Sequence, residues 1–243
     1  MIKQIIVILL ALIWTNSFAI DGQSSTGNGW NFMIAPYAWI TWTNGNISTT
    51  NFDSSLNLTP QDIKNVLDSA LMLHLEASKL KWTFIVDSVY FKLSKELSTA
   101  KFTFRQTTID LGGFYQLMNQ PFRMNRLTGQ IYLGGRYWQM NTELSTLINQ
   151  TQQWLDPIIG GRFVYHMRDK WQLIGYGDIG GFGWVSHFTW QLKALAFYKF
   201  NRYIGLSAGF RALKVNYSTG SNNTRFKYDA VTYGPLIGLI VTF

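Results

Sequence analysis

The sequence predicts an all-β protein, a transmembrane antiparallel up-and-down β-barrel. The first reason is composition: 16% of the residues are aromatic but only 14% are charged, against roughly 25% charged residues in soluble domains. The second is that no long apolar run follows the first twenty residues, whereas a membrane-spanning helix needs about 20 apolar residues. The third is that segments of apolar and polar alternation begin at Trp30 and continue to the end of the chain.

The N-terminal residues 1–19, MIKQIIVILLALIWTNSFA, resemble an export signal. Lys3 supplies the positive start, Ile5 to Trp14 form the apolar stretch, and Ser17-Phe18-Ala19 fits the small-x-small cleavage rule. We therefore expect a cleaved signal peptide and a barrel domain over 20–243. The alternative is a buried or membrane-anchoring helix. Export excludes a cytoplasmic enzyme.

Composition excludes several further classes. The 39 Phe, Trp and Tyr residues are too many for a disordered chain. No cysteine is present, so disulfides, thiolate metal sites and a cysteine nucleophile are excluded. The formal net charge of +8 is compatible with anionic partners. However, Lys and Arg are scattered along the chain, so we expect no nucleic-acid partner.

Turn residues divide the chain into about ten expected strands. They are 30–43, 69–79, 81–93, 101–117, 127–141, 154–167, 170–183, 187–200, 202–217 and 226–243. An even number suits a bacterial outer-membrane barrel with both ends in the periplasm. Connections after even-numbered strands, such as 118–126, are shorter than those expected outside, such as 44–68 and 142–153; the link at 183–186 is the exception. Eight and twelve strands are the nearest alternatives.

The last expected strand ends in an aromatic residue. Phe243 shares one face with Val241, Leu239 and Ile237, and Pro235 interrupts that face. Such a strand closes the sheet against the first strand and leaves no edge in lipid. We expect outer-membrane lipid and the barrel-assembly machinery, reached through the strand ending at Phe243, as partners. A soluble β-sandwich is the alternative, but its strands are normally shorter.

One segment of the first outer loop departs from the β pattern. Thr59-Pro60-Gln61-Asp62 contains an N-cap residue followed by proline at the first helical position. Ile63, Val66 and Leu67 then make a short apolar stripe. These residues predict a short helix over about 60–68, which either folds inward as a partial plug or covers the rim.

Several stretches resemble a family of proteobacterial outer-membrane proteins that are largely uncharacterised. The residues that carry the resemblance are Trp154-Leu155-Asp156-Pro157-Ile158-Ile159-Gly160-Gly161-Arg162, Gly177-Asp178-Ile179-Gly180-Gly181-Phe182-Gly183, Gly209-Phe210-Arg211-Ala212-Leu213, Gly234-Pro235-Leu236-Ile237-Gly238 and Pro36-Tyr37-Ala38-Trp39. The resemblance covers most of the mature chain and implies a single small barrel in a Gram-negative outer membrane. It carries no assigned reaction, so no functional residues are transferred.

Motifs for catalysis or cofactor binding are weak. Gly205-Leu206-Ser207-Ala208-Gly209 spells G-x-S-x-G, but this pattern indicates a nucleophile only at a strand-to-helix turn, and here it lies inside an expected strand. The glycine cluster 177–183 lacks the helix that a phosphate site requires. We therefore expect no cofactor and assign no catalytic residue.

The three histidines give no metal motif. His74 shares an inward face with Glu76, His166 lies near the periplasmic end and His187 lies near the outer rim, so they are not expected to converge on a metal. A pair of Asp178 and His187 at the outer mouth is one conceivable acid–base site. An ordinary solvated histidine is the simpler interpretation of His187.

Strand parity sends one set of charged residues into the lumen. The set is Glu76, Asp87, Asp110, Arg136, Arg162, Asp178, Lys193 and Arg211, and Asp156 is expected to join it. An Arg or Lys facing lipid at the midplane costs about 2–4 kcal/mol, so energetics also favour inward placement. The residues either fill and stiffen the barrel, line a path for polar solutes, or include catalytic carboxylates.

Three functions follow from these alternatives. The first is a non-enzymatic outer-membrane barrel with a structural or surface-interaction role and a largely filled polar lumen. The second is a narrow channel for small solutes or anions, gated by the loop at 44–68. The third is an outer-membrane hydrolase or acyltransferase, which the few histidines and the missing nucleophile disfavour.

Overall fold

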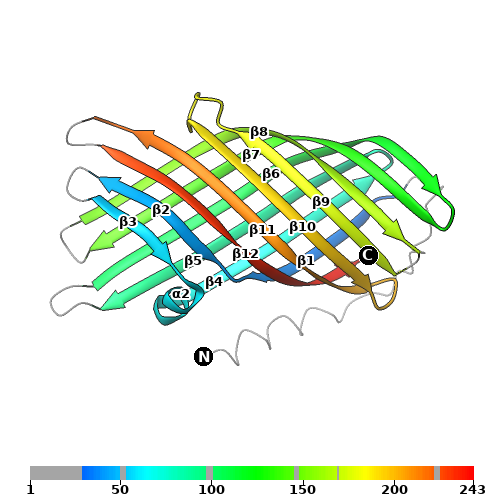
Figure 1. Cartoon of the computed structure of the whole chain (residues 1–243), viewed down its shortest axis with the longest axis horizontal. Coiled ribbons are helices and arrows are strands. Elements are labelled where there is room, and N and C mark those ends of the chain that lie inside the picture. Colours follow the sequence, from blue (N-terminus) through cyan, green and yellow to red (C-terminus); the bar gives the residue numbers. More distant parts are fainter. Residues whose placement is uncertain (1–28, 50–52, 97–100, 145–147, 169, 222–224) are drawn as a thin grey trace.

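The computed structural model describes residues 29–49, 53–96, 101–144, 148–168, 170–221 and 225–243, so the expected signal peptide at 1–19 lies outside the described residues. The described residues form one sheet that closes on itself (Figure 1). In chain order the elements are β1 (Asn31–Trp39), β2 (Trp42–Thr49), β3 (Asp53–Leu58), α2 (Pro60–Val66), β4 (Leu67–Lys79), β5 (Trp82–Glu96), β6 (Lys101–Phe122), β7 (Asn125–Leu144), β8 (Ile148–Met167), β9 (Trp171–Gly180), β10 (Phe188–Lys199), β11 (Ile204–Thr219) and β12 (Phe226–Thr242).

Ten of these strands make the barrel, and β2 and β3 extend it on one side. The order is β1-β4-β5-β6-β7-β8-β9-β10-β11-β12, every pair is antiparallel, and β12 returns to β1. At the seam, the N–H of Phe32 donates to the carbonyl of Phe243 at 2.9 Å and the N–H of Phe243 donates back at 3.0 Å. The predicted ten-stranded antiparallel barrel is confirmed, with the C-terminal aromatic residue at its closure.

The two ends of the barrel differ. At one end, here called the turn end, lie Asn31, Thr242 and short turns such as the one containing Leu80. The opposite end, here called the loop end, holds the connections that follow β5, β7, β9 and β11 (Figure 1). The turn between β6 and β7 is reduced to two residues, Arg123 and Met124, so the expected connection at 118–126 is mostly strand.

The expected outer loop at 142–153 is also wrong. β7 continues to Leu144 and β8 begins at Ile148. Side chains on the outer surface stabilise this extension: Arg105 contacts Glu143 at 2.5 Å, and Asn141 donates to the Thr151 hydroxyl at 2.8 Å. In this extension the outward-facing side chains are polar. The apolar and polar alternation that predicts a strand therefore stops before the hydrogen-bonded pairing of β7 with β8 ends.

The first outer connection, expected as a loop over 44–68, contains a hairpin and a helix. β2 pairs with the part of β12 from Phe226 to Tyr233, whereas β1 pairs with its later residues. Gly234 lies at this change of partner with φ of 155°, and a Cβ there would stand 1.9 Å from the carbonyl oxygen of Ile40. Only glycine therefore permits this close approach.

The predicted helix is confirmed as α2. Thr59 and Asp62 form a capping box, in which the Asp62 N–H donates to the Thr59 hydroxyl at 3.2 Å and the Thr59 N–H donates to the Asp62 carboxylate at 2.9 Å. The helix lies beside the wall next to β3 and β4 rather than at the far rim (Figure 1). Among the described residues, no helix is long and apolar enough to cross a membrane.

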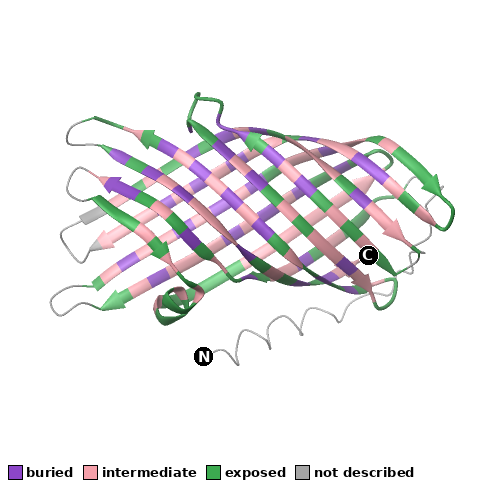
Figure 2. Cartoon of the chain, in the orientation of Figure 1, coloured by how far each residue is buried: buried purple, intermediate pink, exposed green. Residues whose placement is uncertain are grey.

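The outer surface of the barrel is apolar, whereas its interior holds the charged residues together with clusters of buried apolar side chains. Figure 2 shows buried and exposed residues alternating along the strands, as the pleat of a strand requires. Exposed apolar residues on the outer surface include Leu71, Leu111, Leu133, Leu155, Ile159, Leu173, Leu192, Phe210, Ile237 and Leu239. Near the turn end, Phe32 stacks on Phe243 at 5.8 Å between ring centroids and Trp82 packs on Tyr115 at 4.8 Å. This pattern is that of outer-membrane barrels, with an apolar band and an aromatic girdle.

Candidate functional site: an ionic layer between two cavities

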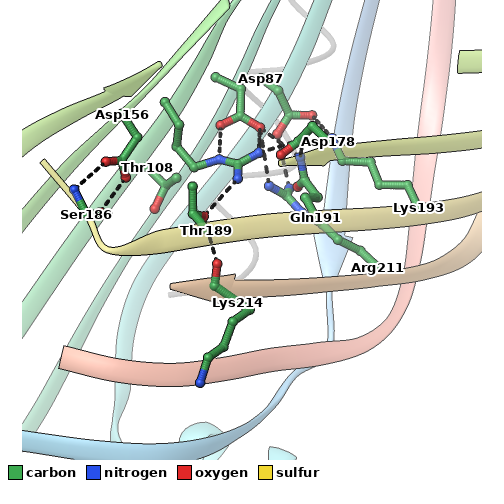
Figure 3. Close-up of polar contacts among 12 residues, drawn as sticks. Asp87, Thr108, Asp156, Asp178, Ser186, Thr189, Gln191, Lys193, Arg211 and Lys214 are labelled. Atoms are coloured by element: carbon green, nitrogen blue, oxygen red, sulfur yellow. Dashed lines mark hydrogen bonds and ion pairs between the residues drawn. The ribbon is translucent and has the colours of Figure 1, made fainter. Parts of the chain in front are cut away.

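All eight charged residues expected in the lumen lie there, and ion pairs join them into two groups. In the first group, Arg136 on β7 binds two carboxylates. Its Nε donates to Asp110 at 2.6 Å and its Nη2 donates to Asp178 at 2.9 Å. Gln191 on β10 donates to both carboxylates at 3.0 Å each. Strands on different sides of the barrel are thereby linked through its interior (Figure 3).

The second group centres on Asp87 of β5. Lys193 donates to one carboxylate oxygen of Asp87 at 3.1 Å, and Arg211 donates to the other at 3.1 Å. The Tyr37 hydroxyl donates to Asp87 at 2.9 Å and accepts from Arg211 at the same distance. A weaker contact of 3.9 Å between Arg211 and Asp110 connects the two groups.

A histidine extends this group toward the turn end. His74 lies between two carboxylates, with Nδ1–H donating to Asp87 and Nε2–H donating to Glu76, both at 2.9 Å. A ring that donates from both nitrogens is an imidazolium. Glu76 also accepts from Arg162, whose guanidinium stacks on Phe114 at 4.1 Å. The histidine therefore belongs to the ion network and not to a separate site.

Together these residues occupy the barrel interior between its two ends. Arg136 and Arg211 are each 0% exposed, so both guanidinium groups are buried. The four cations and four anions of the expected set balance in charge, and His74 adds to the cationic side. Removing one partner of such a buried pair leaves the other charge unpaired and destabilises the fold by about 3–5 kcal/mol. We call these eight residues, with His74, Tyr37 and Gln191, the ionic layer.

Asp156 is buried inside the barrel but does not join the ionic layer. Its carboxylate accepts from the Ser186 N–H at 3.0 Å, from the Ser186 hydroxyl at 2.7 Å and from the Trp154 indole N–H at 3.1 Å (Figure 3). The expected partnership with lumen cations is therefore replaced by a structural role. Asp156 anchors the link between β9 and β10, which sequence reasoning had identified as unusually short.

The expected acid–base candidates do not meet. Asp178 bonds Arg136, Gln191 and the Tyr176 hydroxyl inside the ionic layer, while His187 Nε2 bonds the Ser218 hydroxyl at 2.7 Å on the exposed surface. Ser207 lies within β11 and donates to the Gly238 carbonyl at 3.2 Å, so it is not at a strand-to-helix turn. Within the part of the chain that the structure describes, no group of His, Asp and Glu could hold a metal ion.

A cavity of about 370 Å³ lies on the turn-end side of the ionic layer. His74, Glu76, Asp87, Lys193 and Arg211 form its boundary toward the layer. Farther toward the turn end, its lining includes Gln116, Asn119, Arg126, Gln130, His166 and Gln172. We call it the turn-end cavity, and its lining combines these polar groups with apolar side chains such as Met33, Val164, Phe197 and Ile240.

A larger cavity of about 500 Å³ lies on the loop-end side. Its lining includes Trp39, Ile47, Leu56, Met72, Val89, Phe91, Leu93, Phe104, Trp138, Leu213, Val215 and Tyr228. The size lies within the range of small-molecule sites, which are typically apolar with few polar groups. Sequence reasoning missed this loop-end cavity because parity places residues inside the lumen without giving their depth.

Comparison with known proteins supports the fold alone. No family model matches the chain, and no curated protein matches it. Among solved structures, the outer membrane protease OmpT from Escherichia coli superposes with a TM-score of 0.56 at 10% identity, covering 91% of this chain and 99% of that chain. Neisserial surface protein A (TM-score 0.38, 15% identity, 88% and 99% covered) and Ail of Yersinia pestis (0.38, 11%, 89% and 100%) also match. The fold is that of outer-membrane β-barrels.

Proposed function

We propose that this chain is a non-enzymatic integral barrel of a bacterial outer membrane, closed to ions, which acts at the cell surface through its loop end. The proposal includes export through the segment at 1–19, membership of the proteobacterial family that the sequence resembles, and insertion by the barrel-assembly machinery through the strand ending at Phe243. The apolar outer surface supports lipid as its surroundings, with the turn end in the periplasm.

The observation that carries closure is the ionic layer. It spans the lumen with side chains from β1 and from β4 to β11, and its Arg136 and Arg211 side chains are buried. Barrels of eight strands are already filled by their own side chains, and two further strands widen the bore only modestly. The expected set has equal numbers of cations and anions, and His74 adds only one positive charge to the layer, a small surplus for a path selective for anions.

Planar-bilayer recording of the refolded protein tests closure. We expect wild type to be silent, and the double variant Asp87→Ala/Arg211→Ala to show discrete openings because it removes an opposite pair from the layer without changing the net charge. The matched control is Lys214→Ala/Asp229→Ala, which removes an ion pair from the outer surface of β11 and β12 and leaves the lumen unchanged.

Two results would contradict the proposal. Openings in wild type with ion preference would support the narrow channel instead. A hydrolytic activity lost on His187→Ala would support the enzymatic alternative, for which the likeness to a protease at 10% identity carries no weight. Folding of every variant is checked by the shift in gel mobility on heating.

A further inference from the structure

The barrel wall is interrupted between β3 and β4. β4 pairs with β1 only over Leu73–Ser78, so its first residues have no strand partner on that side in the described ladder. Pro36 is the last β1 residue of this pairing, and a proline has no N–H to continue a ladder. Beyond it, the Trp39 N–H donates to the sulfur of Met72 at 3.2 Å. β3 pairs with β2 and with no other described strand.

The loop-end cavity reaches this interruption. Its lining includes Leu56 and Leu58 from β3, and Ala70 and Met72 from the unpaired part of β4. α2 stands at the same place (Figure 1), and its Ile63 and Val66 also line the cavity. We call this break in the wall, bordered by β3, α2 and β4, the side opening.

The outer surface places the side opening near the level of lipid headgroups. A bulge at the start of β4 brings Asp68 to Lys92 at 2.5 Å, and α2 turns Gln61, Asp62, Lys64 and Asn65 outward as exposed residues. Charged groups are costly in the hydrocarbon region. Leu71, one residue from Ala70, is 63% exposed on the outer face and marks the apolar band beside it. The opening thus lies where polar and apolar surfaces meet.

One charge lines the loop-end cavity. Lys95 on β5 is the single charged side chain among the described lining residues, and no described carboxylate lies within ion-pair distance of it. The rest of the lining is apolar apart from hydroxyl groups and Gln106. The complementary ligand is an aliphatic chain that carries an anionic head group. The ionic layer lies at the inner end of this cavity, so we expect a ligand to enter and leave by the side opening or by the loop end.

We propose that the loop-end cavity binds one single-chain anionic amphiphile, of the fatty-carboxylate type, which enters from the outer leaflet through the side opening. The aliphatic chain lies among Met72, Phe91 and Leu213, and the head group faces Lys95. The chain can belong to a free fatty acid or to a membrane lipid, and the two sources share this chemistry. The inference goes beyond the proposed function, since a conducting barrel could bind the same ligand.

Native mass spectrometry of the full chain, refolded in lipid-free detergent micelles with sodium palmitate, tests the proposal. We expect one palmitate per wild-type chain. Ala70→Phe narrows the opening and should weaken binding about tenfold, the effect of overpacking by roughly 1.4 kcal/mol. Leu71→Phe is the matched control, because the neighbouring side chain faces lipid, and its affinity should equal that of wild type.

Hexadecanol, which has the same chain without the charge, tests the role of Lys95. Wild type should bind palmitate about threefold to fivefold more tightly than hexadecanol, as expected for a solvent-exposed ion pair. Lys95→Gln should remove this preference and leave hexadecanol binding unchanged. Chain extracted from native membranes should carry a fatty acid or an intact lipid, and the added mass identifies the source.

Different results would contradict different parts of the proposal. Folded wild type that binds no palmitate would remove the cavity as a ligand site, and equal binding by Ala70→Phe and wild type would remove the side opening from the proposal. An unchanged palmitate preference in Lys95→Gln would remove the anionic head group from the proposal. Conductance results leave each of these outcomes unaffected.

Discussion

Strand pairing in the barrel wall is incomplete at two places. At β9 and β10 the strands are short, and between β3 and β4 the strands are not paired. At the first place the two strands end at Gly180 and begin at Phe188, well short of their neighbours. Trp154 of β8 and Tyr217 of β11 stack across the space with ring centroids 3.9 Å apart, and Asp156 holds Ser186 beneath them. At the second place no aromatic pair or buried carboxylate bridges the described edges. The difference shows that lost strand pairing can be replaced by side chains, and that β3 and β4 lack the replacement.

The largest effect is expected from Trp154→Ala, which opens the sealed break. Trp154 is 5% exposed, lies between Trp138 and Tyr217, and donates to Asp156. Truncating a buried aromatic residue costs about 3–5 kcal/mol. Urea unfolding in lipid vesicles, followed by gel mobility, measures the loss. Trp42→Ala is the control, since this exposed ring stacks on Tyr233 outside the barrel, and it should cost about 1 kcal/mol. Equal losses would show that the seal is not structural.

A smaller effect is expected from Asp156→Asn. An amide has one acceptor oxygen where the carboxylate has two, so at least one of the donors from Ser186 or Trp154 loses its acceptor. An unpaired buried donor costs about 1–3 kcal/mol. The link at 181–187 carries the exposed aromatic residues Phe182 and Trp184, so chymotrypsin should cleave it faster. Asp229→Asn, on the outer surface, should leave cleavage unchanged; faster cleavage in that control as well would assign the effect to general loosening.

The sequence could predict which side chains face the lumen, but not which of them pair with one another. Alternation sent Asp110, Arg136 and Asp178 inward because the side-chain period of a strand is two. It could not pair them, because a contact such as Arg162 with Glu76 joins β8 to β4 across the lumen and depends on strand tilt and barrel diameter. The inward position of Gln191 carried a usable signal, since it shares a face with Lys193, whereas no expected lumen residue lies on the strand of Tyr37.

Local signals were more reliable than long-range ones. The Thr59–Asp62 capping box and Pro60 predicted α2 correctly. The hairpin of β2 and β3 was missed because Asn44-Gly45-Asn46 and Asp53-Ser54-Ser55 have the composition of a loop, and their strand conformation follows from pairing with β12 and with each other. Pro36 is visible in the sequence, and a proline cannot continue strand pairing. Where it interrupts the pairing, however, depends on which strand lies beside it.

The smallest effect concerns α2, at the open break. Hydrogen bonds from the Thr59 hydroxyl, at 2.6 Å, and from the Thr59 N–H lower the pKa of the Asp62 carboxyl below its ordinary value. A lowered pKa means that the ionised form stabilises the helix above the unfolded-state value near 3.9, and that this contribution is lost as the pH falls through the folded-state value. Amide hydrogen exchange in α2 should therefore be faster in Asp62→Asn than in wild type at pH 6.

The pH dependence distinguishes the cap from a general change in the helix. The difference between wild type and Asp62→Asn should shrink once the pH falls below about 3.9, because the wild-type carboxyl then also becomes neutral. Lys64→Gln, on the same helix, should show no such convergence. Since Ile63 and Val66 border the loop-end cavity, a frayed α2 should also let palmitate exchange faster at pH 6 in Asp62→Asn. A pH-independent difference in exchange would show that Asp62 acts through something other than its charge.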